Sequence, residues 1–153
     1  MKIDEVSLED LHDILILQVL AFQVQAEIYN DYTLPPLVQT LEEVKNDFLQ
    51  QVFLKTERDG KIIGSVRGYK MDDTGYIGRL IVHPDYQNQG VGKALMTEIE
   101  SKFSNLSRFE IFTGHKSKKN LHLYQNKLGY KIFKQEEVDE NLTIVFLEKK
   151  RIN

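Results

Sequence analysis

The stretch that most constrains the fold runs from Gly75 to Phe103, where a predicted strand is followed by a glycine-containing turn and a helix. The apolar run Leu80–Val82 stops just before Pro84, which cannot donate a hydrogen bond to a central ladder. After the turn, apolar residues recur with the spacing of one helical face: Val91, Leu95, Met96, Ile99 and Phe103. The turn therefore lies at a helix N-terminus, where free backbone N–H groups favour an anion.

The glycine spacing in this turn separates several phosphate-binding motifs. A dinucleotide fingerprint needs a third glycine where Leu95 stands. A P-loop that ends at Lys93 needs glycine in place of Gln87 and a hydroxyl in place of Ala94. What the residues do match is Q-x-x-G-x-G, from Gln87 to Gly92. Taken alone, this hexapeptide fits an ordinary strand-turn-helix connection without a ligand equally well.

Length and composition narrow the class of protein. With 153 residues, the chain is expected to form one domain, 1–153, that buries a core without a staple. The absence of cysteine excludes disulfides, thiolate zinc sites and a cysteine nucleophile, and we expect no metal. A net charge of −3 argues against a nucleic-acid partner. Acids near the N-terminus and the lack of a long apolar run predict a cytoplasmic protein without a membrane partner.

Charge is distributed unevenly along the chain. Residues 24–50 contain five acids and one base, whereas residues 116–134 contain six lysines and no acid. The fold is therefore expected to have an acidic end and a basic end, although solvated helix faces explain such runs equally simply.

The first half of the chain is predicted to contain two helices and four strands. A strand over 2–6 leads into a capping box at Ser7–Asp10 and a helix that ends near residue 25. Loop residues occupy 27–36, and a second helix begins near Pro36 and extends to about residue 49. Strands over 52–57, 61–70 and 76–82, joined by tight turns, then form an antiparallel meander.

The second half continues with strands and helices in alternation. The predicted elements are a helix from 91 to 103, a strand over 108–113, a short helix over 120–128, and strands over 130–134 and 142–148. The strand-helix-strand unit implies a parallel pair with a right-handed crossover. The expected fold is α+β (mixed α/β), with a mostly antiparallel sheet of about six to seven strands and about four helices.

Two motifs and this element order resemble the GNAT (GCN5-related N-acetyltransferase) superfamily. The first is Gln87–Gly92, preceded by Leu-Ile-Val-His-Pro. The second, Asn120–Tyr130, looks like the family's N-x-x-x-Y-x-x-x-G-[FY] segment with one extra residue before the glycine. The resemblance implies a single N-acetyltransferase domain with acetyl-CoA as co-substrate, held where the parallel strands splay apart.

The resemblance also implies which residues bind the coenzyme. Backbone amides of Gln89–Lys93 would hold the pyrophosphate, backbone groups of Leu80–Val82 the pantetheine arm, and a bulge near Arg79 would part the strands. Asn120 would bond the arm, although it fits an ordinary helix N-cap equally well. The full set of implied coenzyme-binding residues is Leu80, Ile81, Val82, Gln87, Asn88, Gln89, Gly90, Val91, Gly92, Lys93, Asn120 and Tyr124.

Acetyl transfer requires a proton donor for the leaving thiolate and stabilisation of an oxyanion. By resemblance the donor is Tyr124, and the oxyanion would be stabilised by a backbone N–H near Ile81. Glu27 is the first candidate for the general base, with His83 and His115 as weaker ones. No base is needed if the amine arrives partly deprotonated.

The acidic, aromatic segment around Glu27, Tyr29 and Tyr32 lies where the family builds acceptor specificity. Such a rim favours a small cationic amine. An N-terminal or lysine protein acetyltransferase, a catalytically degenerate acyl-CoA-binding module, and transfer of a longer acyl group stay open as alternatives. A homodimer, with the C-terminal strand as an available edge, is also compatible with the sequence.

Overall fold

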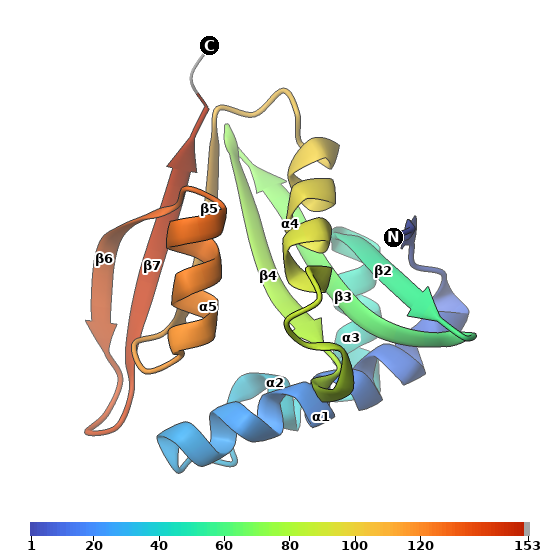
Figure 1. The fold of residues 1–153 in the computed structure, drawn as a ribbon, viewed down its shortest axis with the longest axis horizontal. Helices are drawn as coiled ribbons and strands as arrows, with labels where there is room; N and C mark the ends of the chain where they lie inside the picture. The colour runs from blue at the N-terminus through green and yellow to red at the C-terminus, as the bar shows by residue number, and fades with distance from the viewer. Residues whose placement is uncertain (152–153) are drawn as a thin grey trace.

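The computed structural model describes residues 1–151, which form one seven-stranded sheet with helices on both faces (Figure 1). The strand order is β1-β2-β3-β4-β5-β7-β6, and every neighbouring pair is antiparallel except the parallel pair of β4 and β5. The strands are β1 (Ile3–Glu5), β2 (Val52–Arg58), β3 (Lys61–Met71), β4 (Thr74–Val82), β5 (Arg108–Gly114), β6 (Lys131–Glu137) and β7 (Thr143–Lys150). The α+β class and its mostly antiparallel sheet are thus confirmed.

Five α-helices surround this sheet: α1 (Leu11–Tyr29), α2 (Pro35–Val38), α3 (Leu41–Gln50), α4 (Val91–Lys102) and α5 (Lys118–His122). Two 3₁₀-helices, η1 (Leu8–Asp10) and η2 (Pro84–Tyr86), and a π-helix, η3 (Leu123–Lys127), complete the described chain. The capping box predicted before the first helix is present, since the Ser7 N–H donates to the Asp10 carboxylate at 2.8 Å.

The core has two parts because successive residues of a strand point to opposite faces of a sheet. On β2, Leu54 belongs to the larger cluster with the buried face of α4, and Phe53 belongs to a smaller cluster with residues of α1 and α3. On β3, Gly64 lets α4 approach closely, because a Cβ there would lie 2.9 Å from side-chain atoms of both Val91 and Leu95. The close contact with β3 thus fixes the position of α4, and of the turn that precedes it, relative to the sheet.

β4 and β5 pair over three residues only, Thr74–Tyr76 with Arg108–Glu110, and then separate (Figure 1). The separation coincides with a bulge. Ser65 of β3 pairs with Ile81 and Arg67 pairs with Gly78, so that two β4 residues face one residue of β3. The extra residue bends β4 away from β5. The bulge predicted near Arg79 and the splayed parallel pair are therefore present.

Two predicted helix boundaries are wrong. The sequence predicts a loop over 27–36, but α1 runs to Tyr29 and ends where Asn30, with φ +48, donates its N–H to the carbonyls of Ala26 and Glu27. The helix predicted from Pro36 to residue 49 is divided into α2 and α3. Thr40 divides it, because its Oγ1 accepts from the Glu43 N–H at 3.1 Å and its own N–H donates to the Glu43 carboxylate at 2.9 Å.

The extra residue in the second motif is accommodated by the π-helix η3, which continues directly from α5. A π-helical turn holds one residue more than an α-helical turn, so Tyr124 keeps its place while Gly129 moves one position along the chain. The N-cap of α5 is Ser117, and Asn120 lies inside the helix. The alternative interpretation of Asn120 as an N-cap is therefore wrong.

Two further expectations are corrected by the topology. The C-terminal strand β7 lies between β5 and β6, so it is not an edge; the edges are β1 and β6. The expectation that no run reaches the length of a membrane span is also wrong, because Leu8–Tyr29 could cross a membrane by length and composition alone. One side of α1 is buried against the sheet, while Ile16, Leu20, Val24 and Ile28 on another side are exposed.

Candidate active site

The turn between β4 and α4 presents backbone amides at a helix N-terminus. Gly90 has φ +80, a left-handed conformation that side chains disfavour, and Asn88 has φ +61. Because α4 begins at Val91, the N–H groups of its first turn have no acceptor within the helix. These groups and the positive end of the helix dipole favour an anion at this point.

A cavity of about 530 Å³ opens over this turn, and we name it the glycine-loop cavity. Its lining combines 80–82 from the end of β4, 86–88 and 90–93 from the turn and the start of α4, and side chains of α1, α5 and η3. Its lysines are Lys93, Lys119 and Lys127, and within residues 1–151 no Asp or Glu lines it. This local excess of positive charge in a chain of net charge −3 favours a polyanionic ligand.

A second cavity, of about 550 Å³, is lined by residues of β3, β4, β5 and β7, and we name it the sheet cavity. It shares four lining residues with the glycine-loop cavity: Phe22, Gln25, Leu80 and Asn120. The two cavities therefore meet where β4 has left β5. A ligand that enters along the glycine-loop cavity reaches the sheet cavity at Leu80 and Asn120.

Asn120 lies at this junction, and Tyr124, four residues further along the chain, lines the sheet cavity. Tyr124 is 3% exposed and lines the sheet cavity, and burial raises the pKa of its phenol. Its hydroxyl forms no hydrogen bond within the described chain, so a protonated phenol is available to a bound molecule. Asn120 lines both cavities, and its Nδ2 donates to Thr113 Oγ1 at 3.3 Å, which ties α5 to β5.

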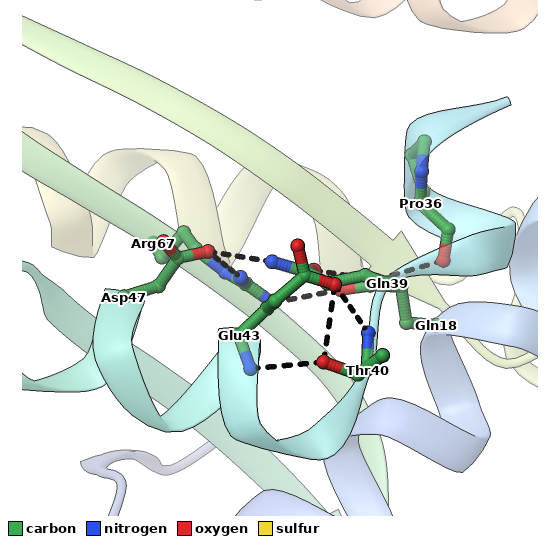
Figure 2. A network of polar contacts seen from close by, with 7 residues as sticks. All are labelled: Gln18, Pro36, Gln39, Thr40, Glu43, Asp47 and Arg67. Carbon is green, nitrogen blue, oxygen red and sulfur yellow. Dashed lines mark hydrogen bonds and ion pairs between the residues drawn. The ribbon is translucent and has the colours of Figure 1, made fainter.

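Part of the sheet cavity's lining belongs to a network of hydrogen bonds and an ion pair around Arg67 (Figure 2). The Arg67 guanidinium is 3% exposed, contacts the Asp47 carboxylate at 3.0 Å and donates to Gln18 Oε1 at 2.7 Å. Gln18 donates in turn to the Pro36 carbonyl and to Gln39, and Gln39 donates to Asp47. Burial and the nearby Arg79 lower the pKa of Arg67 to about 10, so it stays charged at neutral pH.

Arg79 lines the same cavity from the β4 bulge, with φ +49. This left-handed conformation is uncommon for a residue with a long side chain. Its Nε is buried and has no hydrogen-bond partner among the described residues. Burial lowers the pKa of its guanidinium.

Of the residues predicted to contact the acceptor, only Tyr29 lines the sheet cavity. Tyr29 is buried, and its hydroxyl accepts from the Lys116 N–H at 3.0 Å and lies 2.7 Å from Ser117 Oγ, so it joins α1 to the loop after β5. Glu27 and Tyr32 are exposed and line neither cavity. The structure therefore does not bring the predicted acidic rim together at the cavity.

The weaker base candidates and one coenzyme residue have structural partners. His83 Nδ1 accepts from the Asp85 N–H at 3.1 Å, and His115 Nδ1 accepts from the Thr143 N–H at 2.9 Å. Gln89 lines neither cavity, and its side chain accepts from Arg58 at 3.0 Å. The other predicted coenzyme residues line the glycine-loop cavity, apart from Tyr124, which lines the sheet cavity.

Sequence reasoning misses the cavity's arginines and their partners. Arg67 lies inside a predicted strand and Gln18 inside an apolar helical stretch, and a polar residue in such a place is itself a signal, because a buried polar group needs a partner. Asp47 counts toward the acidic segment, yet in the fold its charge is matched by Arg67.

Comparisons with known proteins agree with this fold. The model of the acetyltransferase (GNAT) family matches residues 13–130. The chain is 26% identical over 112 residues to UPF0157 protein YqkA of Bacillus subtilis, covering 73% of this chain and 32% of that protein. It thus spans about a third of that curated relative's length.

Solved structures share the whole fold. The PaiA N-acetyltransferase of Thermoplasma acidophilum, in complex with coenzyme A, has a TM-score of 0.80 at 18% identity and covers 99% of this chain and 100% of its own. The ribosomal-protein-S18-alanine N-acetyltransferase of Escherichia coli has a TM-score of 0.79 at 15% identity and covers 97% and 92%. With a family match over well more than half of its length, the chain belongs to the acetyltransferase (GNAT) family.

Proposed function

We propose that this protein transfers an acetyl group from acetyl-CoA to an amine acceptor, by direct attack while both substrates are bound. The observation that carries the proposal is the pair of cavities that meet at Leu80 and Asn120. Of the residues that the structure describes, three lysines and no acid line one cavity, and Tyr124 lines the other. A thioester at the junction would face an acceptor in the sheet cavity and a phenol at once.

The residues of the glycine-loop cavity fit the coenzyme chemically. Backbone amides from Gly90 to Lys93 suit a pyrophosphate, and Lys119 and Lys127 suit a further phosphate as point charges. The backbone of β4 beyond the bulge has no strand partner on the β5 side, so it can pair with the amides of a pantetheine arm. PaiA, which shares the fold, was solved with coenzyme A.

In the reaction, the acceptor nitrogen attacks the thioester carbonyl carbon, the C–N bond forms and the C–S bond breaks. The Ile81 N–H would stabilise the oxyanion. Tyr124 gives its proton to sulfur, and the proton of the new ammonium returns to the phenolate through water. Because burial raises the pKa of the Tyr124 phenol above that of a thiol, about 8.5, its proton moves to sulfur only as the C–S bond breaks and the ammonium proton returns to the phenolate.

Glu27 is exposed and lies outside both cavities, so its position does not support a role as general base. Both carboxylates that line the sheet cavity, Asp47 and Glu110, have an arginine within 3.0 Å. We therefore propose that the amine loses its proton to water. A cytoplasmic location and a homodimer stay predictions from the sequence.

The test measures free thiol release from acetyl-CoA with a panel of primary amines and with peptides that offer an N-terminal or a lysine amine. We expect release that depends on an amine and falls about a hundredfold or more in kcat for Tyr124→Phe, with the Kd of coenzyme A changed less than about threefold. Tyr130→Phe is the control, because Tyr130 is buried nearby but lines neither cavity.

Three results have distinct meanings. Release with peptides alone would assign the protein acetyltransferase alternative. If the protein binds the coenzyme but releases no thiol with any acceptor, it is the catalytically degenerate binding module. An unchanged kcat in Tyr124→Phe would show that Tyr124 is not the proton donor.

A further inference from the structure

The charged groups of the sheet cavity are unequally matched. Within the described chain, four charged residues line it: Asp47, Glu110, Arg67 and Arg79. Asp47 pairs with Arg67 at 3.0 Å, and its Oδ2 also accepts from Gln39 at 2.8 Å. Glu110 pairs with Arg108 at 2.8 Å. Both acids are therefore already engaged.

Arg79 is the remaining cation. Within residues 1–151 it forms no ion pair within 4.0 Å, and its buried Nε has no hydrogen-bond partner. An arginine guanidinium presents donors in a fixed fork that matches a carboxylate, and a buried donor without a partner is costly. The sheet cavity thus contains, beside Arg67, a guanidinium that no acid of residues 1–151 pairs within 4.0 Å, and the two positive charges together would attract an anion.

The backbone at Arg79 points to a role for this side chain. Its φ of +49 lies in the left-handed region that favours glycine, yet the chain has an arginine there. A residue with a long side chain held in this conformation marks a position where strain is kept for function.

The place of Arg79 in the chain puts it next to the junction of the two cavities. Leu80, which lines both cavities, follows Arg79 directly, and Arg79 itself lines the sheet cavity. An anion bound by Arg79 would therefore share the sheet cavity with an acceptor whose nitrogen meets the thioester at the junction. An acceptor that carries a carboxylate as well as an amine, as an α-amino acid does, would supply both groups.

Most of the other residues that line the sheet cavity are apolar or aromatic. The rings of Tyr69 and Tyr76 stack with centroids 5.3 Å apart, and Phe112 and Phe146 lie 5.7 Å apart. Phe112 is 52% exposed although it lines the cavity, so it offers apolar surface that a ligand can cover. An apolar side group on the acceptor would fill this region.

Resting on the proposed function, we infer that the acceptor is an α-amino acid with an apolar side group, whose carboxylate is bound by Arg79. This class replaces the cationic amine expected from the acidic segment, because Glu27 and Tyr32 lie outside the cavity. Arg79 is in this view the residue that determines acceptor specificity, and it takes no part in proton transfer.

The test compares matched acceptors that differ only by the carboxylate: L-phenylalanine against 2-phenylethylamine, and L-leucine against 3-methylbutylamine. Thiol release from acetyl-CoA gives kcat/KM for each. We expect the wild type to prefer the acids by about tenfold to a hundredfold, the range for a hydrogen bond to a charged group.

Arg79→Gly is the principal variant, because glycine adopts the positive φ without strain, which offsets its greater freedom in the unfolded chain, so the variant should fold. We expect it to lose the same tenfold to hundredfold on the acids, mainly through KM, and less than about threefold on the plain amines. Arg79→Lys should recover part of the loss, since it restores charge without the fork. Lys70→Gln, which removes an exposed charge of β3 outside both cavities, is the control and should leave the preference unchanged.

Either of two results would overturn the inference: a wild type that prefers the plain amines, or an Arg79→Gly variant that loses equally on both members of a pair. If no amine at all releases thiol, the proposed function fails instead. Calorimetry with L-phenylalanine on the coenzyme A-loaded protein then decides the inference separately. Binding that Arg79→Gly abolishes would support it, and no binding to the wild type would overturn it.

Discussion

Two buried tyrosines, Tyr124 and Tyr130, show how a single residue's surroundings set its chemistry. Their ring centroids lie 6.2 Å apart, and burial raises the pKa of both phenols. The Glu100 carboxylate accepts a hydrogen bond from the Tyr130 hydroxyl at 2.8 Å, and its negative charge raises the pKa of Tyr130 further. The proton donor proposed for catalysis therefore stays protonated throughout the neutral range.

These raised pKa values predict the pH dependence of stability. An unfolded tyrosine ionises near pH 10, whereas the folded protein keeps these two protonated. The stability they contribute is fully present below about pH 10 and is lost as pH rises toward the folded pKa, by at most about 1.4 kcal/mol per pH unit for each tyrosine. In Tyr124→Phe, we expect this decline to be shallower by about 1 kcal/mol per pH unit.

Urea unfolding between about pH 9 and pH 11 gives the slope for the wild type and for the variant. Tyr32→Phe serves as the control, since Tyr32 is exposed and should leave the slope unchanged. Equal slopes in the wild type and Tyr124→Phe would show that Tyr124 ionises as readily in the folded as in the unfolded protein.

Between elements, β3 and α4 approach each other closely at Gly64. The sequence leaves open whether Gly64 marks a bulge, a close approach or only weak packing. In the structure a Cβ at Gly64 would meet Val91 and Leu95 at 2.9 Å, both of them buried. The glycine is therefore required by the distance between strand and helix.

Gly64→Ala should accordingly lower the free energy of unfolding by about 1–3 kcal/mol, the usual cost of overpacking. Gly78→Ala is the matched control, because a Cβ at Gly78 would have nothing within 4 Å. We expect it to change stability by less than about 0.5 kcal/mol. Urea unfolding of both variants at neutral pH provides the comparison, and a similar loss in the two would contradict the close packing of α4 on Gly64.

Elements with strong periodicity and the glycine turn could be predicted from the sequence, and the family resemblance implied the splayed strands that the structure shows. Tyr124 lines the sheet cavity, and its role as proton donor stays a prediction. Two features could not be predicted from the sequence: the residue at which α1 ends and the charge pairing inside the sheet cavity. Helix propensity continues through Glu27 until Asn30 ends α1 in the left-handed conformation, which removes Glu27 from the presumed loop. The pairing of charges in the sheet cavity could not be predicted either, because Arg67 and Asp47 are 20 residues apart in the sequence and come together only in the folded protein.

At the scale of the molecule, the sheet has two parts that meet at the three residue pairs between β4 and β5. Arg108 of β5 connects strands across this junction, because its guanidinium donates to Thr74 Oγ1 of β4 at 3.4 Å and to Glu148 of β7 at 2.7 Å. Beyond these pairs the two parts separate (Figure 1). Both cavities are lined from the two sides of this gap, the glycine-loop cavity by β4, α5 and η3 and the sheet cavity by β4 and β5. A ligand that fills the gap would contact both parts.

Coenzyme A should therefore stabilise the whole domain. A ligand at 100 times its Kd that binds only the folded state adds about 2.7 kcal/mol, which for a domain of this size raises Tm by roughly 5–11 °C. Dephospho-coenzyme A should give a smaller shift, because one phosphate fewer faces Lys119 and Lys127. Thermal unfolding with each ligand at equal concentration measures the difference. An unchanged Tm with coenzyme A would contradict binding in the gap, and equal shifts would remove the two lysines from the recognition of that phosphate.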